Sequence, residues 1–207
     1  MRKSDSIRLA FYILAVCAAL AYPVKKILSF EYPAVPPKLY LFETEIRDPY
    51  DPMRGRYVQL NFKQNQVRLP DKNTRLMEWR SDNKCFAVLE KNPDGTTRIA
   101  DLVTDVKQVP EGKNFLRVRY SYFQMDYDQK KHIQMSTGLH IIQFPFDRFY
   151  LNESLAPEAE RVVRENTRKG KAYARIKVYE NGNFAMDDLI VDGQPILERL
   201  RGKAATK

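Results

Sequence analysis

The chain has 207 residues, of which 43% are apolar and 12% aromatic, enough to bury one substantial core and too many for a disordered protein. The formal net charge is +9, but residues 1–26 contribute +4 and residues 201–207 contribute +3. The 27–200 segment carries only +2, which argues against a basic face that binds nucleic acid. We therefore expect no nucleic-acid partner and assign the charged ends to an anionic lipid surface or to solubility.

An uncharged run of sixteen residues, Leu9–Val24, lies between Arg8 and Lys25. We favour an uncleaved membrane anchor, because basic side chains on both flanks can reach the interface and lengthen a short span. A secretory signal cleaved near Ala21 and a lipoprotein signal ending at Cys17 are the alternatives. The sequence thus predicts a single-pass inner-membrane protein with its C-terminal domain outside the cytoplasm, or a periplasmic protein if cleavage occurs.

Composition divides the rest of the chain. Three prolines in Glu31–Lys38 indicate a stiff spacer. We expect an anchor or signal segment over 1–26, a proline-rich spacer over 27–38, a β-rich domain over 39–200 and a basic tail over 201–207. There is no internal repeat, and the elements show no alternation of strand and helix that would predict a parallel sheet.

The segment from Asp48 to Phe62 joins an acidic turn to an alternating strand. Its two prolines lack backbone donors, so it cannot form a helix interior or a central strand, and Gly55 is the expected site of a positive φ. From Tyr57 onward the period is two. We expect three apolar side chains to face the core, with Tyr57 on the other face: Val58, Leu60 and Phe62.

The remaining pattern is mostly that of short strands. Asn92–Gly95 and Asn181–Gly182 are turn sequences between apolar runs and predict two hairpins. Phe115–Met125 is expected to form a long strand with Leu116, Val118, Tyr120 and Tyr122 on one face. Ser154–Lys169 carries an apolar stripe with early acids and late bases, which predicts a helix. The fold class is mainly β (β-rich α+β), with antiparallel sheets or a partly open barrel, one soluble amphipathic helix and the N-terminal apolar helix.

The sequence contains no phosphate-binding glycine loop, serine elbow, CxxC or HExxH motif, so we expect no cofactor and no metal. Cys17 and Cys85 cannot both belong to the folded domain. His140, in an apolar stretch, is expected to be structural. Glu153 precedes the predicted helix and is a candidate binding residue, but an acid favoured by the helix dipole is the preferred explanation.

The Asp48–Phe62 segment resembles the signature of the GDYXXLXY family of bacterial membrane-anchored proteins, over roughly Leu39 to Ile196. The matching residues are Pro49, Asp51, Gly55, Tyr57 and Leu60. Two positions depart from the signature. Arg56 stands where the family has Asp, and Phe62 stands where it has the last Tyr.

The resemblance implies a membrane protein and names no reaction. We expect a non-catalytic binding or accessory module for a membrane partner, and the resemblance suggests a multi-pass membrane protein as that partner. The alternative hypothesis is a cell-envelope hydrolase that uses carboxylates such as Asp51 or Glu153. It predicts that these two carboxylates lie in one cleft.

Overall fold

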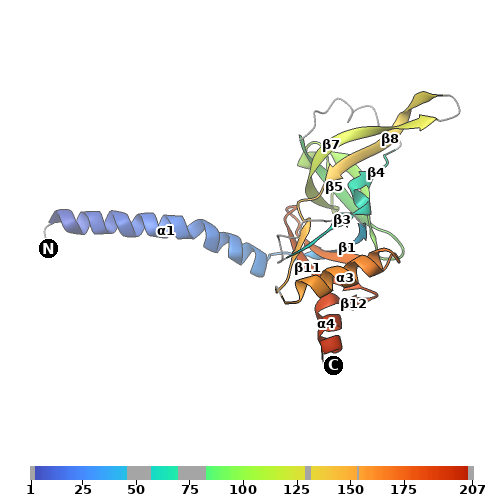
Figure 1. The fold of residues 1–207 in the computed structure, drawn as a ribbon. Helices are drawn as coiled ribbons and strands as arrows, with labels where there is room; N and C mark the ends of the chain where they lie inside the picture. The colour runs from blue at the N-terminus through green and yellow to red at the C-terminus, as the bar shows by residue number, and fades with distance from the viewer. Residues whose placement is uncertain (1–2, 46–56, 70–82, 129–131, 153, 205–207) are drawn as a thin grey trace. The chain divides into compact units, whose positions relative to one another are not determined.

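A computed structural model describes residues 3–45, 57–69, 83–128, 132–152 and 154–204 of the chain (Figure 1). The chain separates into two compact units, residues 1–37 and residues 38–207. Each unit has its own architecture and is described by itself.

The first unit contains one long helix, α1 (Lys3–Glu31), which is blue in Figure 1. Its Phe11–Glu31 part is 21 residues long and apolar enough to cross a membrane. A helix of that length extends about 30 Å, the thickness of a bilayer's hydrocarbon core. The helix continues through Pro23 and ends at Glu31, inside the segment predicted as spacer.

A five-stranded antiparallel sheet forms one half of the second unit, in the order β12-β11-β10-β1-β3. Its strands are β1 (Lys38–Glu45), β3 (Asn61–Phe62), β10 (Ala172–Val178), β11 (Phe184–Val191) and β12 (Gln194–Pro195). Every second residue of β10 is buried, so this strand has the alternation of a sheet with one face on the core.

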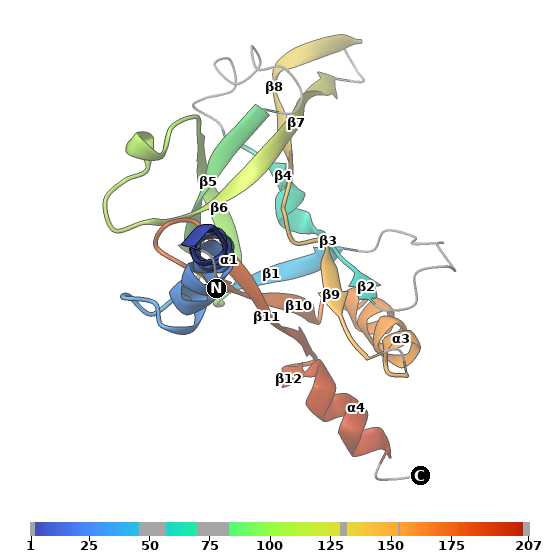
Figure 2. The same cartoon turned by 90° about the vertical axis from the view of Figure 1, so that its left-hand side faces the viewer.

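A second five-stranded antiparallel sheet has the order β4-β8-β7-β5-β6 (Figure 2). Its strands are β4 (Gln66–Val67), β5 (Asn83–Lys91), β6 (Thr97–Val103), β7 (Asn114–Asp128) and β8 (Ile133–Gln143). Two short strands, β2 (Tyr57–Gln59) and β9 (Arg148–Tyr150), pair separately. Two 3₁₀ turns accompany them, η1 (Lys63–Asn65) and η2 (Val106–Gln108).

Both predicted hairpins form, and they share one turn geometry. The Gly182 amide donates to the Tyr179 carbonyl at 3.0 Å, and the Gly95 amide donates to the Asn92 carbonyl at 2.9 Å. Both glycines have positive φ, +76° and +83°, as expected for the left-handed residue that follows a type I turn. A Cβ at Gly182 would lie 2.4 Å from the Phe115 ring of β7, so glycine is also needed there for the contact between the sheets.

Two helices complete the second unit. Helix α3 (Ala156–Thr167) packs against β2 and β10 through Ala159, Val162 and Val163, which are buried (Figure 2). Helix α4 (Ile196–Ala204) packs against β11 and β12. The sequence analysis missed α4 and assigned its last residues to the basic tail. The two sheets and α3 share one apolar core that includes Phe42, Leu116 and Ile176.

The predicted class, mainly β with antiparallel sheets, is confirmed, and the described strands form no closed barrel. The prediction for one face of β7 is wrong in part. Leu116, Val118 and Tyr120 are buried, but Tyr122 is 56% exposed. The register shifts between Tyr120 and Tyr122, so Ser121 forms a β-bulge that turns the next side chain to the opposite face.

Candidate functional site

The predicted site residues divide between described and undescribed parts of the chain. Pro49, Asp51, Gly55 and Arg56 lie outside the described residues, and so does Glu153. Their roles, including the carboxylate pair of the hydrolase hypothesis, stay predictions. Three motif residues remain to be placed in the fold: Tyr57, Leu60 and Phe62.

The motif strand is held by the segment before helix α3. Tyr57 pairs with Tyr150, and Val58 pairs with Phe149 in the antiparallel register of β2 and β9. The Leu60 amide then donates to the Asp147 carbonyl at 2.8 Å, so the pairing continues in a single bond where β2 ends. The sequence analysis did not find β9, which has only three residues. The described end of the motif, residues 57–62, is therefore held in place by the segment 147–150.

Phe62 lies at the centre of an aromatic cluster. Its ring centroid is 6.0 Å from that of Phe42, 5.9 Å from Phe144 and 5.4 Å from Phe146, each in an edge-to-face arrangement. Val58, Leu60 and Phe62 are at most 5% exposed, which confirms that all three face the core. The described end of the motif thus supplies packing, and no polar atom of these three side chains is available for chemistry.

Paired acids and bases lie on the outer face of β10 and β11. Asp187 accepts from Arg175 Nε and lies within 2.5 Å of Lys177 Nζ, and Asp188 Oδ2 is 3.8 Å from Arg175. Burial tends to raise the pKa of Asp187, but the hydrogen bonds from Lys177 and Arg175 prevail and lower it. Burial raises the pKa of Asp188. These acids are ion-pair partners of residues on the neighbouring strand.

Three reactive side chains meet inside the second sheet. The Tyr120 hydroxyl lies 3.1 Å from Nδ1 of His140, and both residues are at most 1% exposed, as is Cys85. Burial raises the pKa of the Cys85 thiol and of the Tyr120 hydroxyl to about 12 and lowers the pKa of His140. These shifts keep all three groups neutral at neutral pH, the opposite of what activates a cysteine nucleophile.

The His140 ring is placed by packing as well as by its one hydrogen bond. Its centroid lies 4.8 Å from that of Phe123, and the Phe123 ring also covers Gly138, where a Cβ would approach it to 2.7 Å. Within the described residues no group hydrogen-bonds the buried Nε2 of His140. The histidine is structural, as expected, but only one of its ring nitrogens has a partner in the described part of the chain.

Strands β7 and β8 continue as a two-stranded arm beyond their neighbours (Figure 1). We call residues 122–128 and 133–139 the arm. Strand β5 pairs with β7 only as far as Tyr120, and β4 pairs with β8 only at His140 and Ile141. The arm exposes four large side chains by 40% to 56%: Tyr122, Met125, Tyr127 and Met135.

Asp126 ties the arm to the segment that follows β4. Arg68, one residue after β4, donates to both of its carboxylate oxygens at 2.7 and 3.1 Å, and Thr137 donates to Oδ2 at 2.9 Å. The hydrogen bonds from Arg68 and Thr137 lower the pKa of Asp126. Asp126 sits at the second register shift of β7, so the ion pair holds an irregular part of the arm in one geometry.

The arm was not predicted as a surface from the sequence. The predicted face of β7 placed Tyr122 with the buried residues, and the bulge at Ser121 turns its side chain to the opposite face. His132, in the turn before β8, is exposed and has a φ of +55°.

The fold defines a β-rich domain that follows an N-terminal helix able to span a membrane. The model of the GDYXXLXY protein family matches residues 19–189, most of the chain, and the chain belongs to that family. No curated protein and no solved structure matches it. The resemblance drawn from the motif is thereby confirmed.

Proposed function

We propose that this protein is a membrane-anchored extracytoplasmic binding module whose arm holds a membrane-embedded partner protein. The observation that carries the proposal is the exposure of Tyr122, Met125, Tyr127 and Met135 on one two-stranded arm. Several large apolar side chains that a folded domain leaves exposed on one element are typical of interaction surfaces.

The chemistry of the arm suits a protein surface. Tyrosine and methionine are enriched at protein interfaces, where a ring contributes apolar area and its hydroxyl contributes a hydrogen bond. An isolated two-stranded hairpin is only marginally stable in water, and covering one face with a partner would stabilise it. The Arg68–Asp126 pair limits the motion of the arm before binding, which lowers the entropy lost on association.

The length and apolar character of helix α1 favour a partner that lies in the membrane. Its Phe11–Glu31 part is long enough to span, and only residues 32–37 separate it from β1. A chain of this length reaches about 25 Å when fully extended, so the domain stays close to the membrane that holds α1. In this proposal α1 remains uncleaved and the domain lies on the periplasmic side, where a multi-pass protein presents its loops.

Site-specific photocrosslinking in native membranes tests the proposal. A photoreactive phenylalanine at Tyr122 or Tyr127 should give one discrete protein adduct, identified by mass spectrometry as an integral membrane protein. The matched control is the same probe at Tyr150, which is 69% exposed on β9 and outside the arm. Lipid adducts alone from the arm, or the same protein adduct from Tyr150, would contradict the proposal.

Fractionation tests the anchor separately. The intact chain should sediment with membranes, resist extraction by high salt and be released by detergent. Protease added to spheroplasts should digest the domain. Recovery of the intact chain from the soluble cytoplasm would overturn the assignment of compartment and of anchor together.

A further inference from the structure

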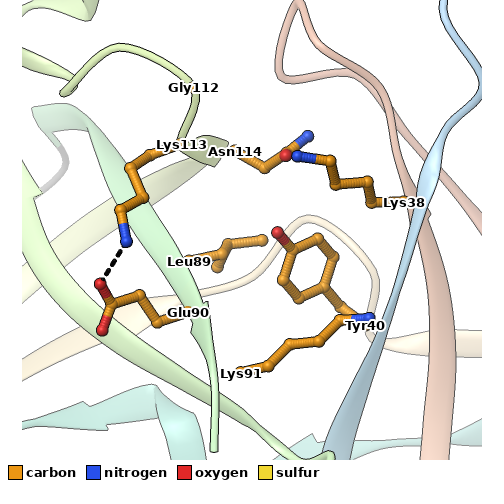
Figure 3. A pocket seen from close by; sticks show the side chains of 8 residues that line it. All are labelled: Lys38, Tyr40, Leu89, Glu90, Lys91, Gly112, Lys113 and Asn114. Atoms are coloured by element: carbon orange, nitrogen blue, oxygen red, sulfur yellow. Dashed lines mark hydrogen bonds and ion pairs between the residues drawn. The ribbon is translucent and has the colours of Figure 1, made fainter.

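A pocket opens in the second unit between the start of β1, the end of β5 and the turn before β7 (Figure 3). Its volume is about 420 Å³, and its polar lining comes from three lysines, one acid, one tyrosine and one asparagine: Lys38, Lys91, Lys113, Glu90, Tyr40 and Asn114. The volume is in the range of pockets that hold small ligands. None of these residues belongs to the arm or to the family motif.

The charge of the lining is positive. Glu90 is its one carboxylate, and that carboxylate is already shared by Lys113, at 2.6 Å, and by Arg98. The hydrogen bond and charge of Lys113 lower the pKa of Glu90, so the acid stays ionised and cannot neutralise a further lysine. Lys38 and Lys91 make no ion pair with a carboxylate in the described part of the chain. Cationic charge therefore exceeds anionic charge around the pocket.

The other polar groups add donors. The Lys91 ammonium lies over the Tyr40 ring, 5.5 Å from its centroid, which holds that charge at the pocket wall. Tyr40 is 5% exposed and Asn114 is 8% exposed, so their polar ends are placed by the core behind them. Figure 3 shows the Tyr40 hydroxyl, the Asn114 amide and the Lys38 ammonium pointing toward one shared space.

We infer that this pocket binds the phosphate group of an anionic ligand, and that its source is a phospholipid headgroup. Ammonium, hydroxyl and amide donors that converge on one space suit a phosphate's oxygens. Basic pockets close to a bilayer commonly hold anionic headgroups. Lys38 is the seventh residue after the end of α1, so the covalent chain keeps the pocket within about 25 Å of that helix end.

The two parts of this inference have different foundations. The phosphate site rests on the pocket alone. The headgroup as source rests on the proposed membrane anchoring of α1. A soluble phosphate ester would be recognised by the same donors. The experiment therefore tests each source with a separate ligand.

The full chain in uncharged detergent micelles is titrated with inorganic phosphate, with dihexanoyl phosphatidylglycerol and with dihexanoyl phosphatidylcholine. Amide chemical shifts of Gly112, Lys113 and Asn114 report binding. Saturable shifts are expected with phosphate and with phosphatidylglycerol, weaker ones with phosphatidylcholine, and all should diminish as salt is added. Because this titration needs no membrane insertion, its outcome does not depend on whether α1 is an anchor.

Matched variants test the site. Lys38→Gln should weaken phosphate binding by about tenfold, the effect of losing one charge-assisted hydrogen bond. Lys84→Gln changes the same charge on exposed β5 surface outside the pocket and should leave affinity unchanged. Binding of phosphate without phosphatidylglycerol supports the site and assigns it to a soluble ester. Saturable shifts with neither ligand, or equal weakening by both variants, would overturn the inference.

Discussion

Two regions of the second unit use the same kinds of side chain for opposite purposes. In the cluster around Phe62, four phenylalanine rings from three segments of the chain surround one another with almost no exposure. In the arm, two tyrosines and two methionines from two strands stand in solvent. Aromatic content therefore says little about role. The surroundings decide it, since in the described part of the chain several elements enclose the cluster, while the arm consists of two strands that extend beyond β4 and β5.

The largest effect is expected from Phe62→Ala. Removing a ring that is 1% exposed leaves a cavity among Phe42, Phe144 and Phe146, and such truncations cost about 3–5 kcal/mol of unfolding free energy. Denaturant unfolding of the full chain in detergent, followed by circular dichroism, measures it. A loss below about 1 kcal/mol would show that the cluster is not the centre of the core.

Gly182→Ala tests the contact that joins the two sheets. Left-handed backbone costs alanine about 1–2 kcal/mol, and displacing the Phe115 ring adds about 1–3 kcal/mol. Gly95→Ala is the matched control, because its φ of +83° is similar but nothing lies within 4 Å of the added Cβ. The difference between the two unfolding free energies isolates the contact. Equal losses of unfolding free energy in the two variants would mean that the Phe115 ring moves aside without a measurable cost.

Phe62→Tyr restores the family's own residue and should nevertheless destabilise this chain. The rings around Phe62 offer no hydrogen-bond acceptor, and an unsatisfied buried hydroxyl costs about 1–3 kcal/mol. Thermal unfolding of the variant beside the wild type measures the loss. A neutral or stabilising outcome would show that a polar group reaches this position from the segments outside the described residues.

His140 should make stability depend on pH. Burial beside Cys85 and Tyr120 lowers its folded pKa below the ordinary value of 6.5, so below pH 6.5 the unfolded chain takes up a proton that the folded chain resists. Its contribution is complete above pH 6.5 and is lost as the pH falls through the folded pKa. Unfolding free energies at pH 7.5 and 5.5 should differ in the wild type.

The matched variants separate the two histidines of the chain. His140→Gln should flatten the dependence between pH 7.5 and 5.5, while His132→Gln, at an exposed position in the turn before β8, should preserve it. The same slope in His140→Gln and in the wild type would assign the proton uptake to another group.

The smallest effect on stability is expected in the arm. Tyr122→Ser and Tyr127→Ser remove exposed rings, so the unfolding free energy should change by less than about 0.5 kcal/mol. The same variants should abolish recovery of the partner in a membrane pull-down. A large loss of unfolding free energy would show that these tyrosines stabilise the fold, as Phe62 does.

Period-two patterns predicted most strands, because β10 and β5 are half-buried and record their faces in the sequence. They failed at Ser121, where one extra residue reverses the alternation and no composition signal marks it. Strands of two or three residues, such as β9 and β12, are too short to show a period. Helix α4 was hidden because its basic residues read as a charged tail.

The motif and the pocket show a second limit of sequence reasoning. Leu60 and Phe62 could be assigned to the core from alternation alone. The pocket could not be found, because Lys38, Lys91 and Lys113 come from β1, β5 and the turn before β7, and each resembles an ordinary surface lysine. Convergence of distant residues depends on strand register, which pairing sets and local pattern does not.

The bulge at Ser121 affects the direction of the arm but not the pairing of residues between β7 and β8. Beyond it, Tyr122 opposes Ile141 and Phe123 opposes His140, and deletion of Ser121 would leave these pairs in place. What deletion would remove is the local bend and extra twist that a bulge adds. One inserted or deleted residue at this position could thus change the direction of the arm while every exposed side chain of the arm is kept.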